Sequence, residues 1–272
     1  KKIDVAIVWK LPNNILYKLI NIRLIFSLGA GVDHILQLSN YNNTPIIRIK
    51  DPNMRERMFN HILSQILNYQ LKLNLYNDAQ IQNIWISERE TKLNRHVKIG
   101  ILGLGYIGGF VGKRLQKLKY NVLGYRKYKL NSKMPFEVLT GDKLNVFVSE
   151  ADILVSILPS TFETIGLINK KFLNIMKKNS LLINVGRGST LNEHDLIKHL
   201  DINNNFYASL DVFKKEPLKR NHKFWNHSNV TVTPHIAAIT DIDSSIDYMF
   251  NKFIIFTKKN RIKSDVDLKK GY

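Results

Sequence analysis

The stretch Val97-Lys98-Ile99-Gly100-Ile101-Leu102-Gly103-Leu104-Gly105-Tyr106-Ile107-Gly108 decides the fold of this chain. Its first half is an apolar run typical of a buried strand, and helix-like sequence at residues 110–118 follows the last glycine. Gly103 would permit a tight turn, Gly105 would let backbone N–H groups approach a pyrophosphate, and Gly108 would let the helix pack closely on its strand. The stretch therefore predicts a dinucleotide site at Gly103, Gly105, Tyr106, Ile107 and Gly108, with a ligand-free glycine turn as the alternative.

Strand and helix patterns alternate on both sides of this loop. We expect strands at residues 97–102, 121–125, 153–157, 181–185, 206–210 and 230–233. Several are nearly continuous apolar runs, which is typical of parallel strands covered on both faces and predicts a doubly wound (Rossmann) sheet. Before the loop, shorter strands at 3–9, 24–28 and 45–49 alternate with helix-length segments at 13–20 and 32–38. These predict a smaller α/β unit.

Two helices are expected to connect these parts. Asp51 is a candidate N-cap with Pro52 at the first helical position, and the helix that follows carries an apolar stripe suited to the core or a subunit interface. The last helix, at 244–256, lies beyond the sheet and is expected to return to the N-terminal unit. We therefore predict a split substrate domain (1–51 plus 237–272) and an inserted nucleotide-binding domain (52–236).

Composition narrows the class of protein. The chain has 272 residues, 44% of them hydrophobic, which suffices for one or two domains, and it has no cysteine, which excludes disulfides and thiolate chemistry. Its 41 Lys and Arg against 22 Asp and Glu give a net charge of +19, but the basic residues are scattered, which does not favour a specific nucleic-acid partner. No apolar run reaches bilayer length and no metal-ligand spacing occurs, so we expect a soluble cytoplasmic protein without a metal.

The sequence after the second strand of the sheet indicates which dinucleotide would bind. An acidic residue there would accept hydrogen bonds from the 2′-OH of NAD, but this chain has Gly124-Tyr125-Arg126-Lys127-Tyr128-Lys129. Arg126 can bind a 2′-phosphate through two parallel hydrogen bonds from its planar guanidinium, and Lys127 adds a second positive charge. The stretch predicts NADP(H), with chance placement of bases in a lysine-rich chain as the alternative.

Arg187, Glu216 and His235 are the residue types that reduction of a keto acid requires. Arg187 follows a strand and could hold a carboxylate with two hydrogen bonds while polarising the keto oxygen. Hydride addition leaves an alkoxide, and His235 could protonate it because histidine titrates in the required range. Glu216 is the candidate that orients the histidine ring. Taken singly, each residue also fits a surface ion pair, a turn or a structural role.

In the order and spacing of these motifs, the chain resembles the D-isomer-specific 2-hydroxyacid dehydrogenases, and most of all their bacterial glyoxylate/hydroxypyruvate reductase A branch. The resemblance rests on the glycine loop, Phe26 to Asp33, Leu158 to Asn169, Asn184 to Gly188, Leu210 to Pro217 and Thr233 to Thr240. It implies that Arg187 binds and polarises the keto acid, His235 is the acid/base and Glu216 is its partner. It also implies a homodimer with its active site between two domains.

The resemblance implies further binding residues. Cofactor contacts are expected from the glycine loop, Arg126, Lys127, Leu158, Pro159, Ser160, Thr164, Val185, Gly186, Arg187, Asp211, His235 and Ala237. Backbone N–H groups around Gly29, Ala30 and Gly31 are expected to hold the substrate carboxylate. Arg187, His235 and Trp9 are also expected to contact the substrate, with Trp85 reaching in from the second subunit. For Trp9 and Trp85, core or interface packing is the alternative.

Two departures from the family pattern are visible. The chain begins at Lys1 without an initiator methionine, and its outer domain is short by about a strand and a helix, so we expect the natural N-terminus upstream. A fourth glycine, Gly109, follows Gly108 and would loosen the start of the helix, since glycine inside a helix costs about 1 kcal/mol. The competing functions are another 2-hydroxyacid dehydrogenase of the same fold and a dinucleotide-sensing, corepressor-like binding protein.

Overall fold

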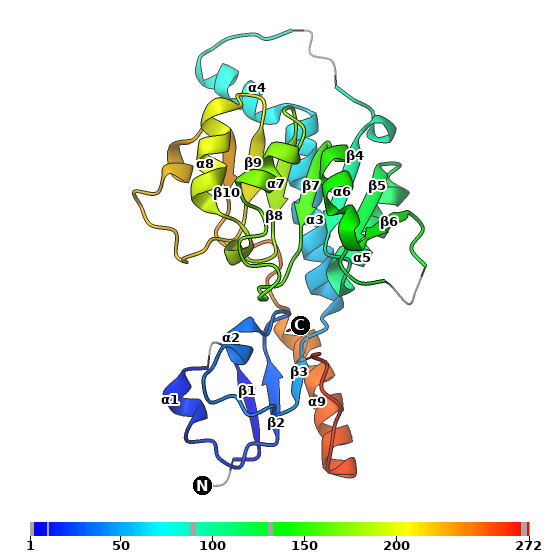
Figure 1. Cartoon of the computed structure of the whole chain (residues 1–272), viewed down its shortest axis with the longest axis vertical. Coiled ribbons are helices and arrows are strands. Elements are labelled where there is room, and N and C mark those ends of the chain that lie inside the picture. The colour runs from blue at the N-terminus through cyan, green and yellow to red at the C-terminus, as the bar shows by residue number, and fades with distance from the viewer. Residues whose placement is uncertain (1–2, 10, 88–90, 130–132, 268–270, 272) are drawn as a thin grey trace. The chain divides into compact units, whose positions relative to one another are not determined.

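The computed structural model describes residues 3–9, 11–87, 91–129, 133–267 and 271. The chain divides into two compact units, which are described separately (Figure 1). The first comprises Lys1–Met54, Pro159–Ile165 and Ile239–Tyr272, and the second comprises Arg55–Leu158 and Gly166–Ala238. No helix of the described residues combines the length and apolar character that a membrane span requires.

The first unit is built on a small parallel sheet. Within the described residues its strand order is β1-β2-β3, and the short helices α1 and α2 lie between the strands in sequence. The bounds are β1 Val5–Val8, α1 Asn13–Leu16, β2 Leu24–Ser27, α2 Asp33–Leu36 and β3 Ile46–Arg48. Helix α1 is shorter than the predicted 13–20. Beyond Leu16 the N–H groups of Lys18 and Leu19 donate to the carbonyls three residues back, each at 3.0 Å, so the chain continues as a tight turn instead of an α-helix.

Helix α9 (Ile242–Lys259) belongs to this first unit, although it lies at the other end of the chain. Its Met249 and Phe256 are buried against Leu24, Phe26 and Ile47 of the small sheet. The expected return of the last helix to the N-terminal unit is therefore confirmed. The helix is longer than the predicted 244–256 at both ends.

The second unit contains a wholly parallel sheet that has seven strands in the described part of the chain, in the order β10-β9-β8-β7-β4-β5-β6 (Figure 1). The strands are β4 Lys98–Leu102, β5 Asn121–Arg126, β6 Glu137–Thr140, β7 Ile153–Ser156, β8 Leu181–Asn184, β9 Tyr207–Leu210 and β10 Val230–Val232. The longer helices are α3 Pro52–Gln70, α4 Leu73–Ile81, α5 Tyr106–Lys117, α6 Leu144–Glu150, α7 Lys170–Ile175 and α8 Glu193–Ile202. This confirms the predicted doubly wound fold.

Strand β6 is the strand that the sequence analysis misses. It lies at the edge of the sheet, pairs only with β5 and has an exposed Glu137 at its start. An edge strand of this kind lacks the continuous apolar run that identifies the central strands. Its hydrogen bonds to β5, rather than its side chains, define it.

The two faces of the large sheet have separate apolar cores. Leu181 and Ile183 of β8 pack in the cluster formed with α3 and α5, whereas Leu182 packs in the cluster formed with α6, α7 and α8. Successive side chains of a strand point to opposite faces, so a strand covered by helices on both sides must be apolar throughout. This explains why strands such as Leu181–Asn184 are fully buried.

The strand order places a switch point at the centre of the sheet. From β4 the chain continues to β5 and β6 on one side, and then crosses to β7, β8, β9 and β10 on the other. Sheets of this type bind ligands at the carboxyl ends of the strands beside such a switch point. The loops after β4 and β7 are therefore the expected place for a ligand.

Candidate active site

The glycine loop connects β4 to α5 at this switch point. Gly103 has φ +106°, a left-handed conformation that favours glycine, and its N–H donates to the Tyr125 carbonyl at 3.1 Å. A Cβ at Gly108 would lie 1.9 Å from the Gly103 carbonyl oxygen, so the third glycine is required by the close contact of the helix with the turn. Both features agree with the turn and packing roles that the sequence predicts for these glycines.

Gly105 differs from its neighbours because a Cβ there would meet no atom within 4 Å. It is the N-cap residue of α5, and no side chain caps the first turn of that twelve-residue helix. The open space therefore lies beside the N–H groups that begin the helix, where the partial positive charge favours an anion. The residues present fit the pyrophosphate of a dinucleotide.

The residues predicted to read the ribose lie at the end of the neighbouring strand. Arg126 is the last residue of β5, directly after Tyr125, whose carbonyl bonds the glycine loop. Lys127 follows it and is exposed, and its Nζ lies 5.7 Å from the centre of the Tyr128 ring. Arg126 and Lys127 therefore come just after the residue whose carbonyl bonds the glycine loop. The end of β5 carries these two basic residues in place of the carboxylate that would bind the ribose of NAD.

The loop after β7 carries the other predicted cofactor residues, Leu158, Pro159, Ser160 and Thr164. Thr164 Oγ1 donates to the Pro159 carbonyl at 2.6 Å and accepts from the Thr161 N–H at 2.8 Å, so one hydroxyl closes the turn. Ser160 is buried. Leu158 belongs to the second compact unit, whereas residues 159–165 group with the first.

Arg187 lies just beyond the carboxyl end of β8, after the buried residues Val185 and Gly186. Its Nη1 donates to the Gly186 carbonyl at 2.9 Å. The next residue, Gly188, contacts the backbone of Phe213 so closely that a Cβ would lie 1.9 Å from the Phe213 carbonyl carbon. The Arg187 turn and the loop after β9 are therefore packed directly against each other.

Glu216 and His235 form a hydrogen-bonded pair. His235 Nδ1 lies 2.8 Å from Glu216 Oε2, while Glu216 Oε1 accepts from the Phe213 N–H at 3.0 Å. Both carboxylate oxygens are thus engaged, one on the histidine and one on its own loop. The His235 side chain is 43% exposed, so its ring remains accessible to a small substrate. The pairing that the sequence analysis predicts for these two residues is present.

The three loops also lie side by side because β8, β9 and β10 are neighbours in a parallel sheet. Arg187 follows β8, Glu216 follows β9 and His235 follows β10. A guanidinium, an imidazole and the carboxylate paired with that imidazole are therefore presented at one edge of the sheet. This is the same edge at which the glycine loop lies.

Asp211 has a structural role that the sequence analysis does not anticipate. Its buried carboxylate accepts from Thr233 Oγ1 at 2.6 Å, the Ile236 N–H at 2.9 Å and the Ala237 N–H at 3.0 Å. These donors flank His235, which adopts φ +55°. Asp211 therefore fixes the turn that presents the histidine, and its predicted contact with the cofactor, like that of Ala237, stays a prediction.

A second histidine, His61 of α3, is electrostatically coupled to Asp211. Burial lowers the pKa of His61 and the charge of Asp211 opposes this shift, with burial the larger effect. His61 Nε2 is buried and has no hydrogen-bond partner among the residues that the structure describes. Burial therefore favours the neutral form of His61 beside Asp211.

The predicted substrate loop, Gly29 to Gly31, lies in the first unit after β2. Ser27 Oγ is within hydrogen-bond distance of both the N–H and the carbonyl of Gly29, at 3.3 and 3.2 Å. The ring of Trp9 lies against the same glycine, because a Cβ at Gly29 would be 2.3 Å from Trp9 Cζ3. Trp9 is 51% exposed and its ring centre lies 5.5 Å from that of His34. In the first unit, the half-exposed side chain of Trp9 therefore lies beside a glycine-rich loop.

Across the described residues, no group of three or more His, Cys, Asp or Glu side chains could hold a metal ion. The site is defined by an arginine, a histidine–carboxylate pair and a glycine loop.

A dinucleotide-binding α/β fold with this set of side chains defines a class of oxidoreductases, and comparison with known proteins identifies the family. Residues 63–237 match the model of the D-isomer specific 2-hydroxyacid dehydrogenase, NAD binding domain. This chain belongs to the D-isomer specific 2-hydroxyacid dehydrogenase family.

Curated relatives cover almost the whole chain. The glyoxylate/hydroxypyruvate reductase A of Photorhabdus laumondii is 33% identical over 100% of this chain and 88% of the relative, and that of Yersinia enterocolitica is 30% identical over 99% and 88%. Among solved structures, the NADPH-dependent glyoxylate/hydroxypyruvate reductase of Sinorhizobium meliloti, in complex with NADP and sulfate, is 30% identical with a TM-score of 0.91. The alignment covers 99% of this chain and 86% of that chain. A 2-hydroxyacid dehydrogenase of Xanthobacter autotrophicus, in complex with NADPH and MES, is 29% identical over 99% and 85%, with a TM-score of 0.92.

Proposed function

We propose that this chain reduces small 2-keto acids, glyoxylate and hydroxypyruvate above all, with NADPH. The observation that carries the proposal is the His235–Glu216 pair at the sheet edge that also bears the glycine loop. Both named relatives are glyoxylate/hydroxypyruvate reductases, and the solved structures of two family members hold NADPH or NADP.

NADPH would supply a hydride to the keto carbon when bound. The glycine loop would hold its pyrophosphate through backbone N–H groups at the start of α5, and Arg126 with Lys127 would bind the 2′-phosphate. Leu158, Pro159, Ser160 and Thr164 would line the same cofactor site, as would Val185 and Gly186. The open space at Gly105 and the basic end of β5 support this assignment.

Arg187 would bind the substrate carboxylate and draw electron density from the keto oxygen. His235 would then donate its proton to that oxygen from Nε2, because Nδ1 is engaged by Glu216. Glu216 would stabilise the charged ring before the transfer and hold its orientation throughout. The backbone N–H groups of residues 29–31 and the Trp9 side chain would also bind the substrate, as the family resemblance implies.

We further infer a cytoplasmic homodimer. Three apolar side chains, Ile81 at the end of α4 and Ile84 and Trp85 just after it, are 80%, 53% and 94% exposed. Apolar residues gathered in this way on one segment favour a subunit interface. The family resemblance further implies that Trp85 contacts the active site of the second subunit.

The test of the proposed function is a spectrophotometric assay of NADPH oxidation with glyoxylate, hydroxypyruvate, pyruvate and larger or phosphorylated keto acids. We expect the highest kcat/KM for glyoxylate or hydroxypyruvate. A higher value for a bulkier or phosphorylated acid would assign a different dehydrogenase activity of the same fold. Absence of turnover together with salt-sensitive DNA binding would instead indicate a dinucleotide-sensing binding protein.

The cofactor preference is tested by Arg126→Asp. Losing charge-assisted hydrogen bonds to the 2′-phosphate lowers kcat/KM for NADPH by about 10- to 100-fold, while the new carboxylate favours NADH. Steady-state kinetics with both cofactors measures the change, and Lys129→Ala is a control because Lys129 is exposed and further along the chain. A wild-type preference for NADH would contradict the assignment.

A further inference from the structure

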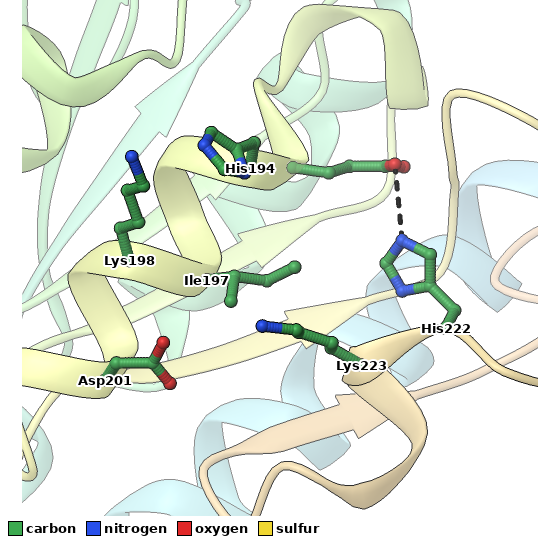
Figure 2. Close-up of a pocket in the computed structure, with 7 residues that line it drawn as sticks. His194, Ile197, Lys198, Asp201, His222 and Lys223 are labelled. Atoms are coloured by element: carbon green, nitrogen blue, oxygen red, sulfur yellow. Dashed lines mark ion pairs between the residues drawn. The ribbon is translucent and has the colours of Figure 1, made fainter.

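The loop that carries Glu216 is fastened at both ends by one carboxylate of the neighbouring helix α8. Glu193 Oε1 accepts from the Lys214 N–H at 2.8 Å, and Glu193 Oε2 lies 3.6 Å from His222 Nε2. Lys214 and His222 lie on either side of Glu216 in the sequence, so Glu193 contacts the loop before and after the residue that orients His235. Glu193 and His222 both line a pocket of about 460 Å³, and the dashed line at His222 in Figure 2 marks their contact.

The hydrogen bonds of His222 direct its proton towards Glu193. His222 Nδ1 accepts from the Phe224 N–H at 3.3 Å, so in the neutral ring the proton is on Nε2, which faces the carboxylate. The His222 ring also packs on Phe224, which is fully buried, with 4.6 Å between ring centres. The second contact of Glu193 is therefore made to a ring held in place by the core.

Glu193 itself is held in position. It is the first residue of α8, directly after the N-cap Asn192, whose side chain accepts from the Asp195 N–H. The Glu193 side chain is only 19% exposed. A carboxylate is favourable at a helix N-terminus, so the residue joins a rigid element to the loop at no electrostatic cost to the helix.

These contacts form a continuous path from α8 to the catalytic histidine. Glu193 holds Lys214 and His222, the loop between them holds Glu216, and Glu216 bonds His235 at 2.8 Å. We propose that Glu193 is a positioning residue for the reduction, one that fixes the loop at residues 213–222 so that Glu216 stays aligned with His235. This proposal rests on the proposed function for its effect on turnover.

A merely structural ion pair is available on the same helix for comparison. Asp201 Oδ1 lies 3.6 Å from His227 Nε2, the same separation as the Glu193 pair, and His227 Nδ1 likewise accepts a backbone N–H, that of Asn229. His227 lies beyond the Glu216 loop. Asp201→Ala is therefore a matched control that removes a carboxylate–histidine pair of α8 without touching the loop.

The kinetic test compares Glu193→Ala, Glu193→Gln and Asp201→Ala. We expect Glu193→Ala to lower kcat by about 10- to 100-fold with little change in KM for NADPH, because small misplacements of catalytic groups are costly. Glu193→Gln keeps an acceptor for Lys214 and recovers part of the rate, and Asp201→Ala leaves kcat unchanged. In a Glu216→Gln background, Glu193→Ala should cause no further loss. A fully additive loss, or wild-type kcat in Glu193→Ala, would overturn the proposal.

A second measurement does not depend on turnover. Long-range ¹H–¹⁵N spectra of histidine-labelled protein report the ring nitrogens of His235, assigned by the loss of its signals in His235→Ala. In Glu193→Ala these signals should move towards their positions in Glu216→Gln, and they should stay in place in Asp201→Ala. If the wild-type chain reduces no keto acid but the signals move, the proposed function fails and the positioning role stands. Unmoved signals refute the positioning role.

Discussion

Replacing His235 by alanine is expected to lower kcat for glyoxylate or hydroxypyruvate by about 10³-fold, because the change removes the proposed proton donor. NADPH affinity should change by less than about threefold. Hydride addition to a ketone leaves an alkoxide, and this oxygen must be protonated as the charge develops. His235 is held by Glu216 at 2.8 Å and is 43% exposed, so it is both oriented and accessible.

The experiment combines steady-state kinetics with NADPH binding measured by fluorescence. His227→Ala is the matched control, since His227 also pairs with a carboxylate, at 3.6 Å, but follows a different part of the chain. His235→Gln tests the chemistry further, because an amide can donate a hydrogen bond but cannot release a proton at neutral pH. Turnover within tenfold of wild type in either His235 variant would rule out His235 as the acid.

The arrangement of Glu216 and His235 could be predicted from residue type and order. A histidine after the last strand and a carboxylate after the preceding one must lie at the same edge of a parallel sheet, since carboxyl ends of parallel strands coincide. The glycine loop could be predicted for the same reason: Gly103 requires a left-handed φ and Gly108 a close approach. In both cases the residue types and their order along the chain are enough to predict where the residues lie.

The contacts that hold this site in place could not be read in the same way. Glu193 and Lys214 are far apart in the chain, and an exposed-looking glutamate at a helix start has an ordinary explanation as a favourable charge. Asp211 likewise receives bonds from Thr233, Ile236 and Ala237, two of which are backbone donors with no side-chain signature. Such contacts depend on how the loops run in space, and the spacing of apolar residues along the sequence does not predict the course of a loop.

Loss of the Arg187 side chain has the second large effect that we expect. Arg187→Gln lowers kcat/KM for a 2-keto acid by about 10³-fold, since a bidentate charged interaction with the carboxylate and polarisation of the keto oxygen are lost together. NADPH binding should change much less. Arg187→Lys should recover little activity, because a lysine is a point charge that cannot form the two parallel hydrogen bonds.

Arg114→Ala is the control for the loss of a guanidinium. Arg114 pairs with Glu56 at 3.5 Å and lies over the Phe59 ring, 5.1 Å from its centre. It belongs to α5 and does not lie at the carboxyl ends of the strands. A substrate pair isolates the role of the carboxylate: each keto acid is compared with its methyl ester. If Arg187 binds the carboxylate, the ester and Arg187→Gln both remove that contact, so their combined loss in kcat/KM should be smaller than additive, although the variant also loses the polarisation of the keto oxygen. Additive losses would place the carboxylate elsewhere, with the backbone N–H groups of residues 29–31 as the remaining site for it.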